Sequence, residues 1–250
     1  MSDPSPSPPL CIADDATFWP WMPSTAFAAL AASGTPVVIP LAGMADWGLG
    51  HALDAEETVL MPVLEAACRQ LPAGVRPLVL PPLRFLFGAD PGCAFAVDQP
   101  AALSLITEVA ASVGASGFSK VVLLNASPWN EEICAAAARD LRVSLCLHMF
   151  HVHLSALGLD FHPQRSQSRR RLQTLLTWLT GQAPEAAAGG AAPEAPWGAE
   201  PVGALPGPAA DGAAAFAEGP PILAEAAGRL AAVLREVRAR HRMTTKLTPP

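Results

Sequence analysis

Continuous apolar runs alternate with amphipathic segments along most of the chain. The apolar runs are predicted as strands buried on both faces, because such strands lack polar alternation; they cover residues 35–43, 76–83, 120–127 and 142–154. The amphipathic segments are predicted as helices over residues 23–33, 54–71, 99–117, 130–141 and 168–181. Strands and helices alternating at this spacing predict an α/β domain over residues 18–181, a three-layer α/β/α sandwich with a mainly parallel sheet.

The two ends of the chain have a different pattern. Residues 1–17 are rich in Pro and Ser and are predicted to be loose, and residues 243–250 form a short tail. Residues 182–219 are an Ala/Pro/Gly-rich, low-complexity segment of a flexible or extended type. Residues 220–242 form an amphipathic helix that docks on the domain or on a partner, the first being the commoner outcome; its apolar side carries Leu223, Ala227, Leu230, Leu234 and Val237.

The amino-acid composition and the net charge limit which partners and which cellular location are expected. The net charge is −6 and only 15% of the residues are charged, which disfavours nucleic acid or an anionic membrane as the main partner. No long apolar stretch predicts a membrane span, and the first residues lack the pattern of a signal peptide. The number of Cys residues is five, without a CxxC pair, which is typical of a reducing compartment. A cytoplasmic protein is therefore expected.

The candidate site lies at one edge of the predicted sheet. Ligands of parallel α/β sheets bind outside the carboxyl ends of the strands, so the loops that matter are 42–53, 84–98 and 125–130. None of them contains GxGxxG, GxSxG or a Walker A motif. Dinucleotide binding, a serine nucleophile elbow and a phosphate-binding loop are therefore not indicated.

Four segments together resemble the creatininase (creatinine amidohydrolase) family. They are "PVVIPLAG" at 36–43, "PPLRFLFG" at 81–88, "GFSKVVLLNASPWN" at 117–130 and "LDFHPQRSQS" at 159–168. The corresponding family patterns are P-L-G-S-x-E-Q-H-G, P-P-x-x-Y-G, G-F-x-x-x-x-x-x-N-G-H-G-x-N and H-A-G-x-x-E-T-S. The resemblance covers roughly residues 18–180 and implies a metal-dependent amidohydrolase with a zinc or manganese pair.

The same resemblance implies that most metal ligands have been replaced. Carried over residue by residue, the family's first Glu and His fall on Ala45 and Trp47, and its later His falls on Ser127. The bridging Asp falls on Glu56, and the His of the last segment falls on His162, with Gln167 in place of the Glu. Ala and Trp cannot hold a divalent ion, and Ser is a poor zinc ligand. Trp47 and Trp129 would also fill the space of the metals.

The leading prediction is therefore a non-catalytic protein of creatininase type, with no cofactor. The family is oligomeric, which implies a homo-oligomer or a complex with an active paralogue, and a small molecule is a further candidate partner. The predicted pocket comprises Asp46, Trp47, His51, Asn125, Trp129 and Asn130. The third function class is a small-molecule binding module that uses this Trp-lined pocket.

The alternative is a divergent amidohydrolase that acts on a cyclic amide or another C–N bond. Glu56 and His162 would be catalytic, and a rebuilt Zn or Mn site would use Glu56, His151, His153 and His162. The simpler interpretation makes these ordinary strand-end histidines, and makes the acids of 46–57 solvated groups at a helix N-terminus. The basic run 165–173 is interpreted as a solvated or oligomer-contacting face, or as a contact for an acidic partner or phosphate.

Overall fold

The computed structural model describes residues 17–87, 93–162, 166–184 and 212–240, and its centre is a parallel sheet. The strand order is β3-β1-β8-β9, and β4 also pairs with β1. Every pairing in this sheet is parallel. The strands are β1 (Val37–Ala42), β3 (Leu78–Val79), β4 (Leu83–Arg84), β8 (Lys120–Asn125) and β9 (His148–His153).

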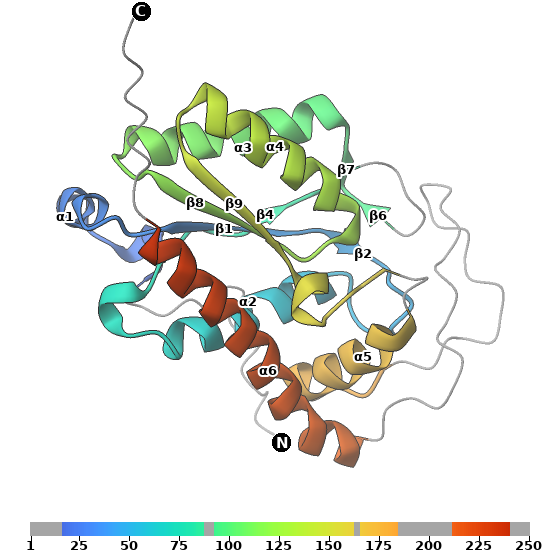
Figure 1. Cartoon of the computed structure of the whole chain (residues 1–250). Helices are drawn as coiled ribbons and strands as arrows, with labels where there is room; N and C mark the ends of the chain where they lie inside the picture. Colours follow the sequence, from blue (N-terminus) through green and yellow to red (C-terminus); the bar gives the residue numbers. More distant parts are fainter. Residues whose placement is uncertain (1–16, 88–92, 163–165, 185–211, 241–250) are drawn as a thin grey trace, which may run out of the picture.

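Helices cover both faces of this sheet, which confirms the predicted α/β/α class (Figure 1). One face carries α3 (Gln99–Ala115) and α4 (Glu131–Ser144), while the other carries α2 (Ala55–Arg69), α5 (Ser166–Thr180) and α6 (Gly212–Ala239). Each layer has its own apolar core, because alternate residues of a strand point to opposite faces. Val38 packs with α2, α5 and α6, whereas Val37 and Ile39 pack with α3 and α4.

Short elements shape the carboxyl edge of the sheet. Two small two-stranded sheets follow β1 and β4: β2 (Met44–Ala45) with β6 (Cys93–Ala94), and β5 (Leu86–Phe87) with β7 (Ala96–Val97). The 3-10 helices Pro128–Asn130 and Leu154–Leu157 follow β8 and β9. The remaining short elements lie near the other edge: α1 (Phe27–Ala32) and the 3-10 helices Trp19–Trp21, Ser24–Ala26 and Ala73–Val75.

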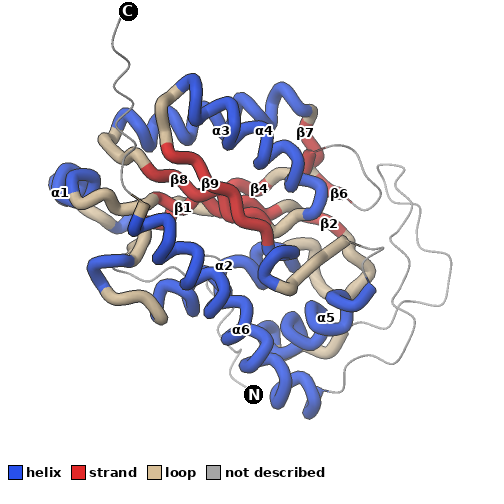
Figure 2. The backbone as a smooth tube through the Cα atoms, in the orientation of Figure 1, coloured by secondary structure: helices blue, strands red, loops and turns tan. Residues whose placement is uncertain are grey.

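Helix α6 docks on its own chain, as the apolar stripe predicted. It packs against α2 and α5 (Figure 2), and Ala227, Leu230 and Leu234 are fully buried. Its last turn is held by Lys120 Nζ, which donates to the carbonyl of Arg238 at 2.7 Å. The helix begins at Gly212 rather than at the predicted residue 220, and Pro220 and Pro221 lie inside it. Most of the predicted low-complexity segment lies outside the described residues.

The fourth strand is shorter than predicted. The run 142–154 was predicted as one strand, but α4 continues to Ser144 and β9 begins only at His148. Between them Cys146 adopts a φ of 52°, a left-handed conformation that turns the chain back toward the sheet. Arg142 Nε closes this turn by donating to the carbonyl of Met149 at 2.8 Å.

None of the described helices combines the length and the apolar composition that a membrane span requires.

Candidate functional site

Glu56 lies close to the carboxyl end of strand β1. It lies in the first turn of α2, directly after the β1–α2 loop, and its side chain is fully buried. Its Oε2 accepts a hydrogen bond from the backbone N–H of Gly43 at 2.5 Å. The chain just beyond the end of β1 therefore holds the carboxyl group in place from the sheet side.

Trp47 and Ser127, two positions that the sequence predicts to have lost a metal ligand, face this carboxyl group. Burial raises the pKa of Glu56 to about 7, and the Gly43 N–H, the Ser127 hydroxyl and the Trp47 indole each lower it. Glu56 Oε1 and Trp47 Nε1 nevertheless have no partner at hydrogen-bonding geometry within the described chain. The indole and hydroxyl therefore favour the charged carboxylate by proximity, but they compensate only part of the cost of burying it.

An aromatic cluster fills the space next to Glu56. The Trp47 ring lies 6.1 Å from Trp129 and 5.6 Å from Phe161, and Trp129 meets the His162 ring edge-on at 5.1 Å. Trp47 and Phe161 are buried, whereas Trp129 and His162 are half-buried. The sequence offered no signal for Phe161, which lies beyond the predicted strand end. That the two tryptophans occupy the space of a former metal site stays a prediction.

Asn125 connects the third loop to two histidines of β9. Its amide is oriented by Ser127: Nδ2 donates to the Ser127 carbonyl at 2.6 Å, and Oδ1 accepts from the Ser127 N–H. The same Nδ2 faces His153 Nδ1 at 3.2 Å, so that nitrogen must be the acceptor. His153 Nε2 then carries the hydrogen and donates to His151 Nδ1 at 3.0 Å.

This network fixes both histidines as neutral tautomers. Burial lowers the pKa of His153 and of His151, and Arg142 lowers that of His151 further. A metal bound at His153 Nε2 would displace the hydrogen to Nδ1, where it would face the Asn125 amide group. The pair therefore suits a hydrogen-bonded link better than a rebuilt metal site.

Asn130 serves the scaffold of the second loop. The side chain is fully buried, its Nδ2 donates to the Phe85 carbonyl at 3.0 Å, and its Oδ1 accepts from the Phe87 N–H at 2.8 Å. Asn130 therefore fixes the position of β5 relative to the third loop. This is the role that an amide fills well, because it offers one donor and one acceptor side by side.

We expect Asn130→Ala to lower the free energy of unfolding by about 2 kcal/mol, because it leaves backbone groups of Phe85 and Phe87 unpaired. Urea denaturation measures this. Asn130→Asp is a second probe, because it keeps the acceptor for Phe87 but turns a buried carboxylate oxygen toward the Phe85 carbonyl, so it should destabilise the protein at least as much. A loss for Asn130→Ala no larger than that of an exposed substitution would contradict this role.

Glu56, Glu57 and Arg169 are buried, whereas the simpler interpretation predicted solvated groups. Glu57 is 8% exposed and makes a two-point ion pair with Arg84, at 2.5 and 2.8 Å. Arg169 is 3% exposed, and its Nη2 donates to the carbonyl of Trp47 at 2.7 Å. Arg171 bonds Glu225 of α6 at 2.7 Å. The interpretation of Glu56 and Glu57 as solvated acids was therefore wrong, and much of the basic run makes contacts within the chain.

Arg169 is a residue that the sequence argument did not single out. A cation in the first turns of a helix opposes the helix dipole, and this unfavourable placement was its one available signal. The structure explains the placement, because Arg169 holds the backbone of the loop that carries Trp47.

Asp46 and His51, the two remaining predicted pocket residues, and Ala45, a predicted former ligand position, lie between β1 and α2. Asp46 is exposed, and its carboxylate accepts from the Gly48 N–H at 2.8 Å within its own loop. His51 lies 3.4 Å from the Thr177 hydroxyl of α5, and burial lowers its pKa. Ala45 is buried, and its N–H donates to the Leu53 carbonyl at 3.1 Å. These residues hold the loop rather than converge on Glu56.

The donor set does not fit a pair of metal ions. In the described part of the chain, no three side chains of His, Cys, Asp or Glu gather in a group that could hold a metal. Glu56 faces an indole N–H and a hydroxyl, and an indole N–H is a donor that offers no lone pair to a cation. Two divalent ions need several anionic or imidazole ligands, which this arrangement does not supply.

Solved structures resemble this arrangement of strands and helices. A crystal structure of creatinine amidohydrolase (creatininase) aligns with a TM-score of 0.66 and 15% identity, over 91% of this chain and 100% of that one. The chain has the creatininase fold. A manganese creatininase structure aligns with a TM-score of 0.66 and 14% identity, over 90% of this chain and 99% of that one.

A third solved structure also resembles this chain. A putative creatinine amidohydrolase from Bacteroides fragilis NCTC 9343 aligns with a TM-score of 0.62 and 14% identity, over 92% of this chain and 99% of that one. No protein-family model matches the sequence, and no curated protein matches it either. The fold resemblance thus spans at least 90% of this chain in these three comparisons, at a sequence identity of 14–15%.

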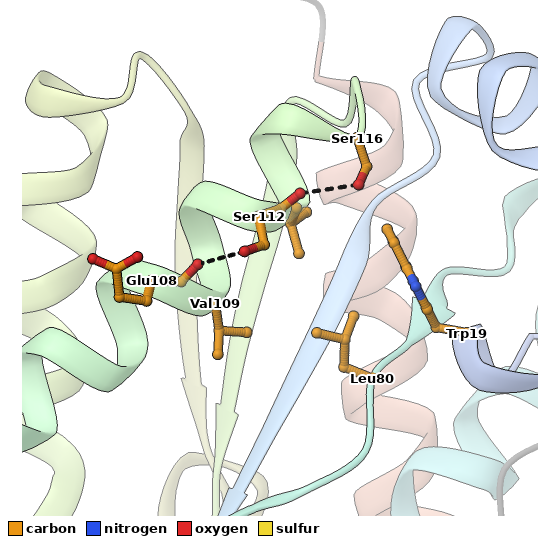
Figure 3. A pocket seen from close by; sticks show the side chains of 7 residues that line it. Trp19, Leu80, Glu108, Val109, Ser112 and Ser116 are labelled. Carbon is orange, nitrogen blue, oxygen red and sulfur yellow. Dashed lines mark hydrogen bonds between the residues drawn. The ribbon is translucent and has the colours of Figure 1, made fainter. Parts of the chain in front are cut away.

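A separate surface hollow lies on the α3 side of the molecule. It has a volume of about 390 Å³ and is bounded by Trp19, Leu80, Val109 and Val113 (Figure 3). The hydroxyls of Ser112 and Ser116 donate to carbonyls of their own helix, as the dashed lines in Figure 3 show. The hollow therefore contains none of the residues predicted for the site.

Proposed function

We propose that this chain is a cytoplasmic, non-catalytic protein of creatininase fold that acts as a structural or regulatory subunit, alone or beside an active paralogue. The observation that carries the proposal is the surroundings of Glu56. The one carboxylate kept at the former metal position faces an indole and a hydroxyl, and it is fully buried. A substrate and a hydrolytic water would need an open space at this point.

The packing of aromatic side chains near Glu56 is a second observation that supports the proposal. Trp47, Trp129 and Phe161 form a continuous aromatic cluster against the loop of Glu56. Arg169 holds that loop from α5. Side chains that pack in this way stabilise the fold, and they leave less room for a substrate beside Glu56.

Metal analysis of the purified full-length chain tests this proposal. We expect that incubation with zinc or manganese, followed by removal of excess ions, leaves far less than one ion per chain, and that creatinine is not hydrolysed. The matched control reinstates the donors as Ala45→Glu, Trp47→His and Ser127→His in one variant, and this variant should retain more metal. A full equivalent in the unchanged chain, abolished by Glu56→Gln, would overturn the proposal.

A divergent amidohydrolase is the second candidate, and one observation favours it. A carboxyl group with a pKa of about 7 is suited to proton transfer near neutral pH. Assays with creatinine and other cyclic amides, with and without added zinc or manganese, distinguish the two candidates. Turnover that depends on both Glu56 and His162 would favour the enzyme.

A further inference from the structure

Two cations lie together at the amino-terminal edge of the central sheet. Lys120 is the first residue of β8, and Arg238 lies in the last turn of α6, whose end reaches this edge (Figure 1). Lys120 is only 6% exposed, and its Nζ donates to the Arg238 carbonyl at 2.7 Å. Burial lowers the pKa of Lys120, and the positive charge of Arg238 lowers it further. The fold therefore holds two like charges close together where little water screens them.

The turn that joins α1 to β1 faces both cations. Arg238 Nη1 donates to the Thr35 hydroxyl at 2.9 Å, and its Nη2 donates to the Ser33 hydroxyl at 3.4 Å. The two hydroxyl oxygens lie 2.9 Å apart. Between them in the chain, a Cβ built on Gly34 would meet Lys120 Nζ at 3.8 Å and, beyond its chain neighbours, no other described atom within 4 Å. The glycine thus leaves a space that the ammonium group borders.

In the described part of the chain, neither cation pairs with a carboxylate. None of the ion pairs there includes Lys120 or Arg238, and the contacts above are made to neutral oxygens. An ammonium group has three N–H donors and a guanidinium group has five. These contacts use one donor of Lys120 and two of Arg238, so both donors and uncompensated positive charge are left for a ligand.

We propose that Lys120, Arg238 and the turn of residues 33–35 bind a phosphate dianion, either free or as the phosphomonoester group of a small molecule. Arg238 offers two N–H groups side by side to two phosphate oxygens, and Lys120 adds a second positive charge. The Ser33 hydroxyl can turn toward the ligand from the Leu30 carbonyl, to which it donates at 2.7 Å. The bound group connects the end of α6 to the starts of β1 and β8.

The charge of the ligand follows from the charges around it. A carboxylate would neutralise one of the two cations, whereas a phosphate dianion neutralises both. The carbonyl end of α6 carries a partial negative charge that opposes an anion, but Lys120 bonds the Arg238 carbonyl there and offsets part of that charge. Charge-assisted hydrogen bonds to phosphate are roughly twice as strong as bonds between neutral groups. A dianion therefore stabilises this edge more than the two hydroxyls do.

Isothermal titration calorimetry on the full-length chain tests the site with inorganic phosphate and with methyl phosphate, against sodium chloride at equal ionic strength. Arg238→Gln should raise the dissociation constant about tenfold, because it removes a charge-assisted contact. Arg235→Gln is the matched control, since it removes the same charge from an exposed position of the same helix and should leave the affinity unchanged. Binding of neither compound, or equal losses in both variants, would overturn the proposal.

The two compounds distinguish the two sources of the phosphate group. Equal affinities would support the proposal with the dianion alone as the ligand. Binding of methyl phosphate without binding of inorganic phosphate would support it with an ester as the ligand.

Aspartate and asparagine at Ser33 provide a second test that needs no added ligand. Ser33 is exposed, so both variants should fold. We expect Ser33→Asp to have a higher melting temperature than Ser33→Asn, and to bind phosphate more weakly because its carboxylate competes. The difference in melting temperature should disappear when Arg238→Gln is added to both. A Ser33→Asp variant no more stable than Ser33→Asn would show that the cations do not favour an anion here. None of these results depends on Glu56 or on whether the chain is an enzyme.

Discussion

Replacing Gly43 with alanine is expected to lower the free energy of unfolding by about 3 kcal/mol, which is the upper end of the cost of overfilling a core. A Cβ at this position would lie 2.1 Å from Cγ and 2.2 Å from Cδ2 of Leu86. Leu86 is fully buried, and Gly43 donates its N–H to Glu56. The added methyl group must therefore displace β5 or the end of β1. Thermal or urea denaturation measures the effect.

Two controls separate crowding from the general effect of replacing a glycine. Gly74→Ala adds a Cβ with nothing within 4 Å, so it should change stability little. Combining Gly43→Ala with Leu86→Ala makes room for the new methyl group, so the double variant should lose less than the sum of the two single losses. Strict additivity would show that Leu86 is not the source of the cost.

Replacing Glu56 with glutamine is expected to stabilise the protein at pH 8 by about 3 kcal/mol and to change little at pH 4. The magnitude follows from a pKa of Glu56 that is raised from 4.5 to about 7, since each pKa unit corresponds to about 1.4 kcal/mol. Glutamine resembles the protonated side chain, so it avoids the cost of a buried negative charge.

The sign of this effect follows from proton binding in the two states. Below about pH 4.5 the carboxyl group is protonated both folded and unfolded, so pH has no effect through Glu56. Between there and its folded pKa of about 7 only the folded state keeps the proton, so the stability of the unchanged protein falls as the pH rises. Above that pKa the carboxyl group is charged in both states, and the folded protein bears the full free-energy cost of burying that charge.

The neighbouring acid provides the comparison for this experiment. Glu57→Gln removes the charge that pairs with Arg84, so it should destabilise the protein at pH 8 instead of stabilising it. Urea denaturation from pH 4 to pH 8 follows all three proteins. A stability difference between Glu56→Gln and the unchanged chain that does not vary with pH would show that Glu56 does not carry the buried charge.

The layers of the fold follow from local patterns in the sequence. The run at Val37–Ala42 is buried at every position, as is Lys120–Asn125, and both are strands at the centre of the sheet. Continuous apolar runs of this length have few other stable placements, because a helix of the same composition would need more residues to form. The spacing of the intervening helices then leaves a parallel sheet as the consistent arrangement.

The sequence predictions fail where contacts between residues far apart in the sequence determine the structure. Glu57 is buried because Arg84, 27 positions further along, meets it with two hydrogen bonds. The apolar letters of 142–147 suit a strand, but the turn at Cys146 lets α4 continue to Ser144. No local pattern reports either contact. At the site, the resemblance named Trp47 and Ser127, yet their approach to the Glu56 carboxyl group was visible only in the structure.

The position of α6 has a consequence for synthesis on the ribosome. Its buried residues, among them Leu230 and Leu234, complete the core formed by α2 and α5, but they lie more than 150 residues after α2. Until they emerge, the apolar face of the growing chain stays exposed to water and to other chains. We expect nascent chains released before Gly212 to depend on chaperones for solubility, whereas the finished chain does not.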